Sequence, residues 1–510
     1  MQRGELVFAP SSDPDQVLAA LSARYCVVAD AAEMAQWTYL DTVDWRLHRA
    51  GMTLRDTHQG PARKLVLSNR SGGQVAAPSR VRFWPRRADT LAPSAVLDQV
   101  THTVGVRALL PMAQVQVRSI PLRLTDDLDK TRVRVRVEQQ RLVGSGEQFL
   151  PLQVRIAPLR GYDRDGDRCA GLLTEAMPQF DSPDPVATIA MTAAGRSPGQ
   201  PSVPKLSLNP GDPAAASTAA VLGRWMDVID SVRGGVLDDV DPEYLHDLRT
   251  AVRATRSILR LTGEPFLGPA GSARFAAEFA WLGQLTTPLR DIDVYLTELA
   301  GRGDLNVSGL DDLDPLVTHL TRRRAHAVRA VRAGLRSERG GQLSSDWRRT
   351  LDGVASTDAP ALNTHALAAQ HARTAYRRIV KAAALVTEHT PPDHLHRLRR
   401  RCKQMRYLLD SFDSIYAPGP HRAVLSALKQ LQNCLGDIQD SDVQRSQLAD
   451  TAATLIERGV PVATVLAMGA LRDRNATRDR AAREVLRLRL QVFTGREMSA
   501  HVAALAAPSS

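Results

Sequence analysis

The amino-acid sequence predicts an α+β domain built on antiparallel strands, followed by an all-α helical bundle with an internal two-fold repeat. Three observations lead to this prediction. Short runs of alternating polar and apolar residues fill the first 185 residues, apolar residues recur every three or four positions after residue 214, and one basic motif occurs twice in that second part. A period of two is typical of half-buried strands, and a spacing of three and four is typical of amphipathic helices.

The first domain is predicted to span residues 1–185. Its alternating runs include RKLVLS (63–68), QVQVRSIPLRL (114–124) and TRVRVRVE (131–138). Between them, DPDQVLAALSARY and LAPSAVLDQVTH predict short helices, because Asp or Ser stands near each start, where a side chain can cap the first backbone N–H groups. Strands and helices mixed in this way indicate an α+β domain.

A linker is predicted between the two domains. The stretch MTAAGRSPGQPSVPKLSLNPGDPAAAS combines Pro, Gly and Ser without periodicity, as flexible connections do. Further along, GEPFLGPAG (263–271) and APGP (417–420) are predicted to separate helices. The predicted division is therefore an α+β domain at 1–185, a flexible linker at 186–213, and a helical domain at 214–505 with halves at about 214–355 and 360–505.

The helical domain repeats a basic motif. The segments YLHDLRTAVRATRSILR (244–260) and HLHRLRRRCKQMRYLLD (394–410) align without a gap. Their basic residues share the spacing i, i+3, i+7, i+10, and two copies of one helical unit are the natural interpretation. The paired positions are His246, Arg249, Arg253 and Arg256 in the first copy and His396, Arg399, Lys403 and Arg406 in the second.

The basic positions of each copy form one stripe of a helix, within an arc of about 80° and over about 15 Å of axis. The apolar stripe lies about a quarter turn away, and small or polar residues, among them Ala251, Ala254 and Ser257, occupy the far side of the first helix. The charges therefore flank the core. Two such helices packed together would bring eight basic groups to one cleft that attracts a dense anion. Ordinary helix charges matched by surface carboxylates are the alternative.

Arginine suits a phosphate site because its planar donors contact two oxygens at once, whereas Lys403 would act as a mobile point charge. Lys429 lies eleven residues before Asp440, but Ala280 stands at the equivalent position of the first copy. We therefore expect a site that includes Lys429 and is not perfectly symmetric.

The histidines and aspartates of the repeat each allow two interpretations. His246 and His396 are either pH sensors, whose pKa rises beside a polyanion, or neutral helix residues. The segments PLRDIDV (288–294) and DIQDSDV (437–443) place aspartates at matching positions. These carboxylates are either magnesium ligands or groups that cap a helix or hold arginines. The predicted site contains no metal, no cofactor and no catalytic residue.

At these motifs the helical domain resembles the CHAD family, the conserved-histidine α-helical domains. The resemblance rests on the two basic segments together with PLRDIDV and LGDIQDSDV, which recur in the family's order, and it covers about 214–505. It implies a bundle of long helices in two pseudo-symmetric halves that binds inorganic polyphosphate in a basic channel. The family's histidine and basic positions carry over onto the eight residues paired above.

The first domain resembles a CYTH, or triphosphate-tunnel, domain. YLDTVDWRLHRAGMTLRD (39–56) follows that family's Y-x-D-T, L-x-x-x-G and L-R signals. The family's E-x-E-x-K metal motif is absent, because RGELVFAP offers only Glu5, and Thr57 stands where an Arg is expected. Hydrolysis of phosphate with a metal needs carboxylates that hold the ion. A catalytically inactive scaffold is therefore expected, with weak anion binding through Arg55 and Lys64.

Composition narrows the functions that remain. Lys and Arg outnumber Asp and Glu by 66 to 55, giving a net charge of +11, which favours an anionic partner. The four cysteines form no C-x-x-C pair, and no run of 18 apolar residues occurs, so we expect a cytoplasmic protein without a membrane span. Aromatic residues, at 5%, do not interleave the basic stripe, so specific nucleic-acid binding is not expected.

Two functions from different classes stay open. The first is a polyphosphate-binding protein that acts through a basic helical channel and associates with polyphosphate granules. The second is a metal-dependent triphosphatase or polyphosphatase that acts through the CYTH-like domain. Metal dependence separates them, because a binder retains polyphosphate in EDTA, whereas such an enzyme releases phosphate only with a divalent metal.

Overall fold

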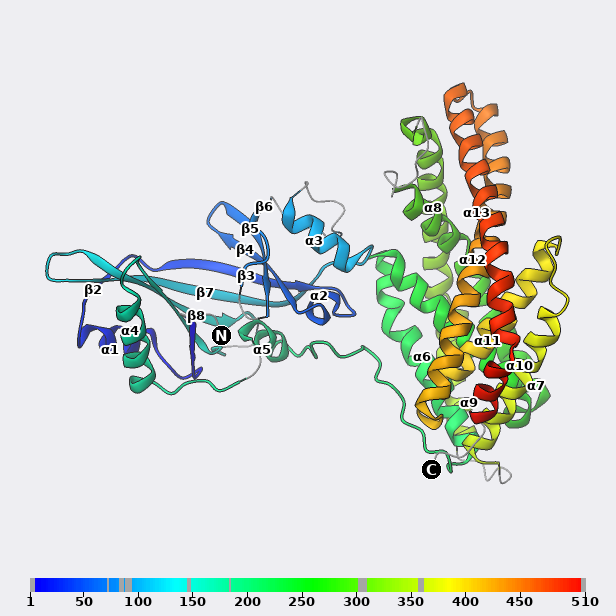
Figure 1. The fold of residues 1–510 in the computed structure, drawn as a ribbon, viewed down its shortest axis with the longest axis horizontal. Helices are drawn as coiled ribbons and strands as arrows, with labels where there is room; N and C mark the ends of the chain where they lie inside the picture. The colour runs from blue at the N-terminus through cyan, green and yellow to red at the C-terminus, as the bar shows by residue number, and fades with distance from the viewer. Residues whose placement is uncertain are drawn as a thin grey trace. The chain divides into compact units, whose positions relative to one another are not determined.

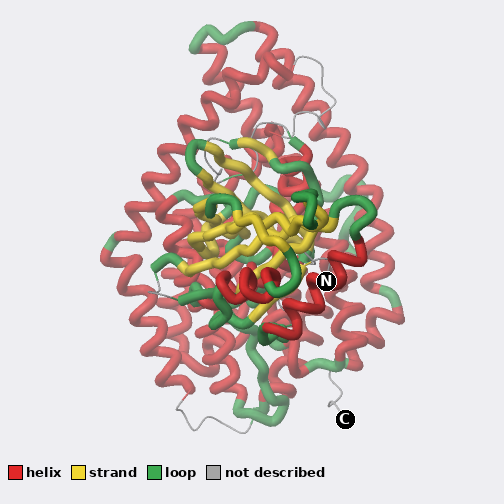
Figure 2. Tube along the Cα trace, turned by 90° about the vertical axis from the view of Figure 1, so that its left-hand side faces the viewer, coloured by secondary structure: helices red, strands yellow, loops and turns green. Residues whose placement is uncertain are grey.

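The chain folds into two compact units, Met1–Pro204 and Lys205–Ser510. The computed structural model describes residues 5–70, 73–81, 87, 94–144, 148–182, 185–300, 310–355 and 362–505. Within these ranges, the long strands belong to the first unit and the second is built from helices (Figures 1 and 2). The predicted order, an antiparallel-sheet domain followed by a helical region, is therefore confirmed.

The strands of the first unit form one antiparallel sheet. In the described residues its nine strands have the order β1-β9-β8-β7-β3-β4-β5-β6, and β2 pairs with the far end of β7. The alternating runs predicted from the sequence lie in β5, β7 and β8. The strand bounds are β1 Glu5–Phe8, β2 Cys26–Ala29, β3 Glu33–Asp41, β4 Met52–Gln59, β5 Ala62–Asn69, β6 Ser79–Arg80, β7 Leu110–Thr125, β8 Thr131–Leu142 and β9 Leu152–Pro158.

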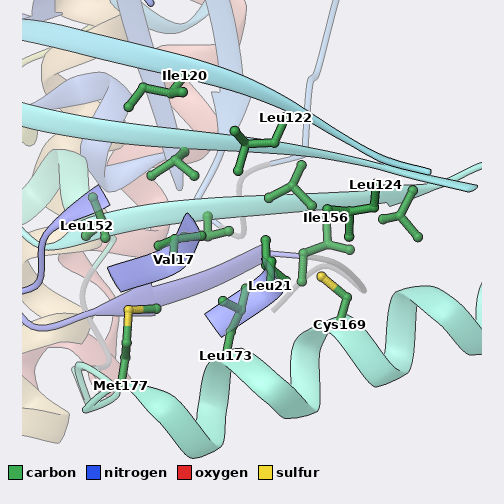
Figure 3. Close-up of a cluster of buried hydrophobic side chains, with 14 of the residues drawn as sticks. Val17, Leu21, Ile120, Leu122, Leu124, Leu152, Ile156, Cys169, Leu173 and Met177 are labelled. Atoms are coloured by element: carbon green, nitrogen blue, oxygen red, sulfur yellow. The ribbon is translucent and has the colours of Figure 1, made fainter. Parts of the chain in front are cut away.

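Two helices, α1 (Pro14–Ser22) and α4 (Asp163–Ala176), cover one face of the sheet. Figure 3 shows apolar residues of the strands meeting residues of these helices, with Leu152 and Ile156 of β9 on the buried side. Helix α1 begins where Asp13 accepts a hydrogen bond from the backbone N–H of Asp15 at 2.9 Å. The predicted capping residue is therefore confirmed. Because side chains alternate along a strand, the residues next to those buried under α1 and α4 point to the opposite face of the sheet.

The helices α2 (Arg46–Arg49) and α3 (Ala95–Val104) belong to a second core formed with β4 and β5. Helix α5 (Val186–Ala193) belongs to a third, in which Val186, Ala190 and Met191 pack with Val115 and Val117 of β7. The prediction that the linker starts at residue 186 is therefore wrong. Small apolar residues made this short helix look like loop in the sequence, although they bury it on the sheet.

Asp41 shapes a turn of the first unit. Its carboxylate accepts hydrogen bonds from the backbone N–H groups of Thr42, Leu47 and His48 at 2.7, 3.0 and 2.9 Å. Burial raises the pKa of Asp41 to about 6, against the lowering effect of these hydrogen bonds. Asp41 therefore organises the chain between β3 and β4, where Trp45 has a left-handed backbone at φ 59°.

Long helices make up the second unit, and α12 and α13 run side by side over much of their length (Figure 1). In the described ranges, two short 3₁₀ turns, Leu310–Leu313 and Asp413–Ile415, accompany them. The helix bounds are α6 Ala214–Asp238, α7 Pro242–Ala300, α8 Asp314–Arg336, α9 Glu338–Ala355, α10 Thr364–Ala383, α11 Pro392–Ser411, α12 Pro418–Glu457, α13 Val462–Thr494 and α14 Arg496–Ala504.

Helix α7 is kinked rather than broken. The predicted break over 263–271 corresponds to one non-helical residue, Gly268, with φ 69° and ψ 168°. Glycine adopts this positive φ without a steric penalty, and Pro265 and Pro269 remove backbone donors on both sides of it. Two helical segments of α7 therefore follow each other, and the basic motif lies in the first.

Both predicted apolar stripes are buried. Leu248 and Val252 of α7 and Leu398 and Cys402 of α11 expose at most 1% of their surface. Small or polar residues of α7 were predicted to occupy the side of the helix away from the apolar stripe. In the structure this side is also covered, because Ala251 and Ala254 are fully buried and Ser257 is buried as well. Residues without long side chains let neighbouring helices approach closely. The motif of α7 is thus enclosed on two sides.

Limited trypsin digestion tests the connection between the units. Residues 194–207 are mostly exposed and include Arg196 and Lys205, whereas Leu208 is buried and its N–H donates to Ser414 Oγ at 2.9 Å. We expect early cleavage after Arg196 or Lys205 that leaves a folded helical fragment starting there, because exposed backbone without tertiary contacts is cut first. Mass spectrometry and circular dichroism would identify the fragment. Digestion without any stable helical product would contradict this division.

Candidate anion-binding pocket

A pocket of about 270 Å³ lies between α7 and α11, with one residue of α12 at its wall. Most of its charged residues are basic, and they come from both helices. Helix α11 starts with Pro392 and carries Asp393 in its first turn, both of which favour a helix start. The lining residues are Arg253, Arg256, Ser257, Arg260, His396, Arg399, Arg400, Lys403, Gln404, Tyr407 and Gln439.

Five of the nine predicted binding residues line this pocket. They are Arg253 and Arg256 from α7 and His396, Arg399 and Lys403 from α11. The helices whose sequences match each other thus contribute to the same cavity. The other four predicted residues, His246, Arg249, Arg406 and Lys429, do not line it.

Arg249 has a structural role in the free protein. Its side chain is buried, and Nη1 donates to Gly283 O at 3.1 Å, Thr286 Oγ1 at 3.0 Å and Thr287 Oγ1 at 2.9 Å. Burial and the nearby Arg253 lower the pKa of Arg249 to about 10. The guanidinium therefore ties the first segment of α7 to the second, and this bonding engages Nη1 inside the helical unit.

The remaining three predicted residues lie elsewhere. Arg406 Nε faces Asp410 Oδ2 at 3.6 Å, and Lys429 is exposed on α12. His246 is exposed near the start of α7, where desolvation and the guanidinium of Arg290 lower its pKa. A neutral His246 in the free protein is the consequence of this lowered pKa.

Two guanidiniums of the pocket rest against glycines of the neighbouring helical segments. A Cβ atom added to Gly283 would lie 3.5 Å from Arg256 Nη1, and one added to Gly436 would lie 3.5 Å from Arg399 Nη2. Arg399 Nη1 also donates to Gln439 Oε1 at 2.9 Å, whereas its buried Nε has no partner. The helix surface thus orients both arginines while leaving donors unused.

The positive charges of the pocket lack close counter-charges. Among the described residues, no carboxylate lies within 4.0 Å of an arginine or lysine that lines it. Burial lowers the pKa of Arg256 and Arg399, and neighbouring arginines add to this effect. Burial, Arg399 and Arg253 lower the pKa of Lys403 from 10.5 to about 6. The cations of the pocket therefore repel one another, and an anion between them would relieve this repulsion.

The matching aspartates act mainly on arginines. Asp293 Oδ1 accepts from Arg324 Nε at 2.6 Å, and Asp442 Oδ1 faces Arg445 Nη2 at 3.1 Å. Asp440 provides longer-range negative charge for Arg399 and Lys403. Within the part of the chain that the structure describes, no three His, Cys, Asp or Glu residues gather as a metal site would require.

Sequence reasoning missed Arg260 and Arg400. Arg260 continues the spacing of Arg253 and Arg256, and Arg400 stands between His396 and Lys403. In the alignment of the two motifs, Arg260 corresponds to Asp410 and Arg400 to Thr250. Both were missed because only repeated basic positions were selected. The helical spacing alone could have found them.

The two motifs also differ in the charge of their last residue. In α11, Asp410 faces Arg406 and offsets its charge. In α7, the corresponding residue is Arg260, which adds a third guanidinium to the pocket wall. The pocket is therefore asymmetric, although for a reason other than the one predicted from Lys429.

Comparisons with known proteins agree with this description of the helical unit. Residues 220–449 match the sequence model of the CHAD domain. Two uncharacterised proteins from two strains of Mycobacterium tuberculosis are 28% identical over 281 residues, which cover 52% of this chain and 50% of theirs. The chain therefore spans about half the length of these curated relatives.

Solved structures show similarity to the same region. The crystal structure of the CHAD domain from the plant Ricinus communis is 27% identical, with a TM-score of 0.49, covering 57% of this chain and 95% of that domain. PptA from Streptomyces chartreusis is 17% identical, with a TM-score of 0.44, covering 55% of this chain and 100% of that protein.

No helix in the described ranges is both long enough and apolar enough to cross a bilayer. The two helices that form the basic pocket carry the repeated motifs, and both motifs lie inside the residues that match the CHAD sequence model. Residues 220–449 therefore form a CHAD domain.

Proposed function

We propose that the CHAD domain binds inorganic polyphosphate and that the pocket between α7 and α11 forms part of its basic channel. The observation that carries this proposal is the convergence of guanidiniums from two helices without a carboxylate within 4.0 Å, among the described residues. Closely spaced cations repel each other, so their grouping lowers stability unless a ligand uses it. Phosphate oxygens match the paired donors of arginine.

A polymer fits this surface better than a single small anion. A second cavity, of about 330 Å³, shares Arg256 and Arg260 with the pocket and extends to Pro269 and Ser272 near the kink of α7. Arg256 and Arg260 thus border both cavities, and Glu264 is the charged residue that the second cavity adds. A chain of phosphates could contact successive arginines, and each added contact forms at high effective concentration.

The proposed channel includes the internal repeat. The motifs at 244–260 and 394–410 would be the two halves of a pseudo-symmetric unit, and the pocket would lie where they meet. Each half then supplies cations to one ligand. We further expect that the protein meets its ligand in the cytoplasm and associates with polyphosphate granules.

Metal-dependent triphosphate or polyphosphate hydrolysis by the first unit is the alternative. That function requires a CYTH-like domain that holds a divalent ion. Two of the acidic residues in the cavity of this unit bear on it: Glu5 lies 3.8 Å from Arg155 and also accepts from Gln153 at 3.1 Å, and Asp181 is exposed. A carboxylate that is already paired with an arginine is less available to bind a metal ion, so we favour an inactive CYTH-like scaffold.

Substitutions that replace one charged arginine of each helix by neutral glutamine test the shared pocket. Arg253→Gln in α7 and Arg400→Gln in α11 should each weaken binding of long-chain polyphosphate roughly ten- to hundred-fold, because each removes a charged hydrogen-bond donor. Isothermal titration calorimetry measures affinity and stoichiometry together. Each variant should keep the wild-type stoichiometry, since one ligand spans both helices.

Arg397→Gln is the matched control, because Arg397 is exposed on α11 but does not line the pocket. It should bind almost as the wild type does. Unchanged affinity at half the stoichiometry in the Arg253→Gln variant would mean that the two helices form separate sites. Wild-type affinity should also fall steeply with added salt, as phosphate contacts that release counterions do.

Proton uptake tests the role of Lys403. In the free protein its pKa of about 6 leaves the amine mostly neutral at pH 8. A bound polyanion stabilises the charged form and raises this pKa, so binding takes up a proton and strengthens by up to about tenfold for each pH unit lowered towards 6. Titrations at pH 8 in buffers of different ionisation enthalpy measure the uptake, outside the range where unperturbed histidines titrate.

The Lys403→Arg variant provides the control for this experiment. An arginine stays charged, so the variant should bind polyphosphate without taking up a proton at pH 8. Equal proton uptake by the wild type and this variant would assign the titration to another group. Absence of uptake in the wild type would remove Lys403 from the proposed site.

Turnover assays decide between the two functions. The fragment 1–204, incubated with inorganic triphosphate and Mg²⁺ or Mn²⁺, should release no phosphate above background, because its carboxylates do not form a free metal-binding set. Colorimetric phosphate detection over hours is sensitive enough. Steady, EDTA-sensitive release would reject the scaffold interpretation and establish the alternative.

A further inference from the structure

The first unit contains a large cavity on the face of the sheet opposite α1 and α4. Its volume is about 1110 Å³, near the upper end of the roughly 300–1,000 Å³ that sites for small organic ligands have. Residues from β1 and β9, at one end of the strand order, and from β4 and β5, near the other end, line it together. The sheet must therefore curve around the cavity, and residues 179–182 and 185–188 close part of it.

One guanidinium in this cavity is held in place and lacks a close carboxylate. The guanidinium carbon of Arg55 lies 3.7 Å from the centroid of the Trp37 ring. Its buried Nε has no hydrogen-bond partner, and among the described residues no carboxylate lies within 4.0 Å of it. Stacking on an aromatic ring fixes the plane of the donors while leaving their edge free.

Two other cations of the cavity have bonded partners, and Asp181 lines it as an exposed carboxylate. Arg155 faces Glu5 at 3.8 Å, and Arg70 Nη2 donates to the backbone oxygen of His48 at 2.7 Å. Side-chain amides near the cavity are hydrogen-bonded as well, because Gln140 accepts from the Tyr39 hydroxyl at 3.2 Å and donates to Gln153 at 2.5 Å. Among the described residues that line the cavity, Arg55 is thus the guanidinium with a buried donor that lacks a partner, whereas Arg70 is exposed and bonded to a backbone oxygen.

Apolar side chains form another part of the wall. Val7, Val66 and Phe180 line the cavity and are partly exposed, while Val186 and Ala187 of α5 are buried behind it. Half-exposed apolar groups inside a cavity gain free energy when a ligand removes them from water. An inorganic polyanion cannot provide this contact, and an apolar ligand tail can.

We propose that this cavity binds an amphipathic organic monoanion whose carboxylate or sulfonate contacts Arg55 and whose apolar body packs on Val7, Val66 and Phe180. One charge on the ligand matches the one stacked guanidinium whose buried donor is unused, and the apolar wall selects against bare phosphate chains. This site is independent of polyphosphate binding by the CHAD domain, since every residue named belongs to the first unit.

Fluorescence of 8-anilinonaphthalene-1-sulfonate on the full chain tests this proposal. We expect one saturable site per chain whose probe is displaced by octanoate and not by inorganic triphosphate at the same concentration. Arg55→Gln should weaken binding of the probe roughly ten- to hundred-fold, because a charged hydrogen bond is lost. Arg55→Lys, which retains the charge, should lose less.

Arg118→Gln is the matched control, because Arg118 is an exposed cation on β7 that does not line the cavity. This variant should bind the probe as the wild type does. Circular dichroism and thermal unfolding establish that each variant is folded, and Phe180→Ser gives an independent loss through the apolar wall. Displacement by triphosphate, absence of a saturable site, or wild-type binding by folded Arg55→Gln would each overturn the proposal.

Discussion

Repulsion between like charges along α7 and α11 is the constraint that the helical unit has to satisfy. Arg253, Arg256 and Arg260 lie within two turns of α7, and they meet Arg399, Arg400 and Lys403 of α11 across one pocket. Burial of apolar stripes on both helices offsets this repulsion, because each buried leucine contributes roughly 1.5–3 kcal/mol. The core thus holds together cations that would otherwise separate.

The same arrangement separates structural from ligand-binding arginines. Arg249 and Arg253 belong to one sequence stripe, yet Arg249 is buried with three acceptors and Arg253 is exposed at the pocket. The difference arises from the second segment of α7, whose Thr286 and Thr287 face only the first turns of the motif. The helix pattern could show that the two arginines share a face. It could not show which of them finds acceptors.

Local patterns predicted the fold well where one face of an element is buried. The alternation in β7 and β8 and the caps at Asp13 and Ser94 are physical causes that act within a few residues, so they are readable in the sequence. Helix α5 was missed because its stability depends on the sheet beneath it. For the pocket, five residues were predicted, and Arg260 and Arg400 were missed because the repeat was taken as the criterion, although the structure departs from it at both positions.

The two units apply opposite electrostatic arrangements to basic residues. In the CHAD domain, cations gather without close carboxylates, and the lowered pKa of Lys403 is the consequence. In the first unit, Arg63 is bound to Asp56 and Arg155 lies near Glu5, whereas the buried Nε of Arg55 has no partner. A surface with many unpaired charges suits a ligand that carries many charges. A cavity that combines one stacked guanidinium with an apolar wall suits a ligand with one charge and an apolar body.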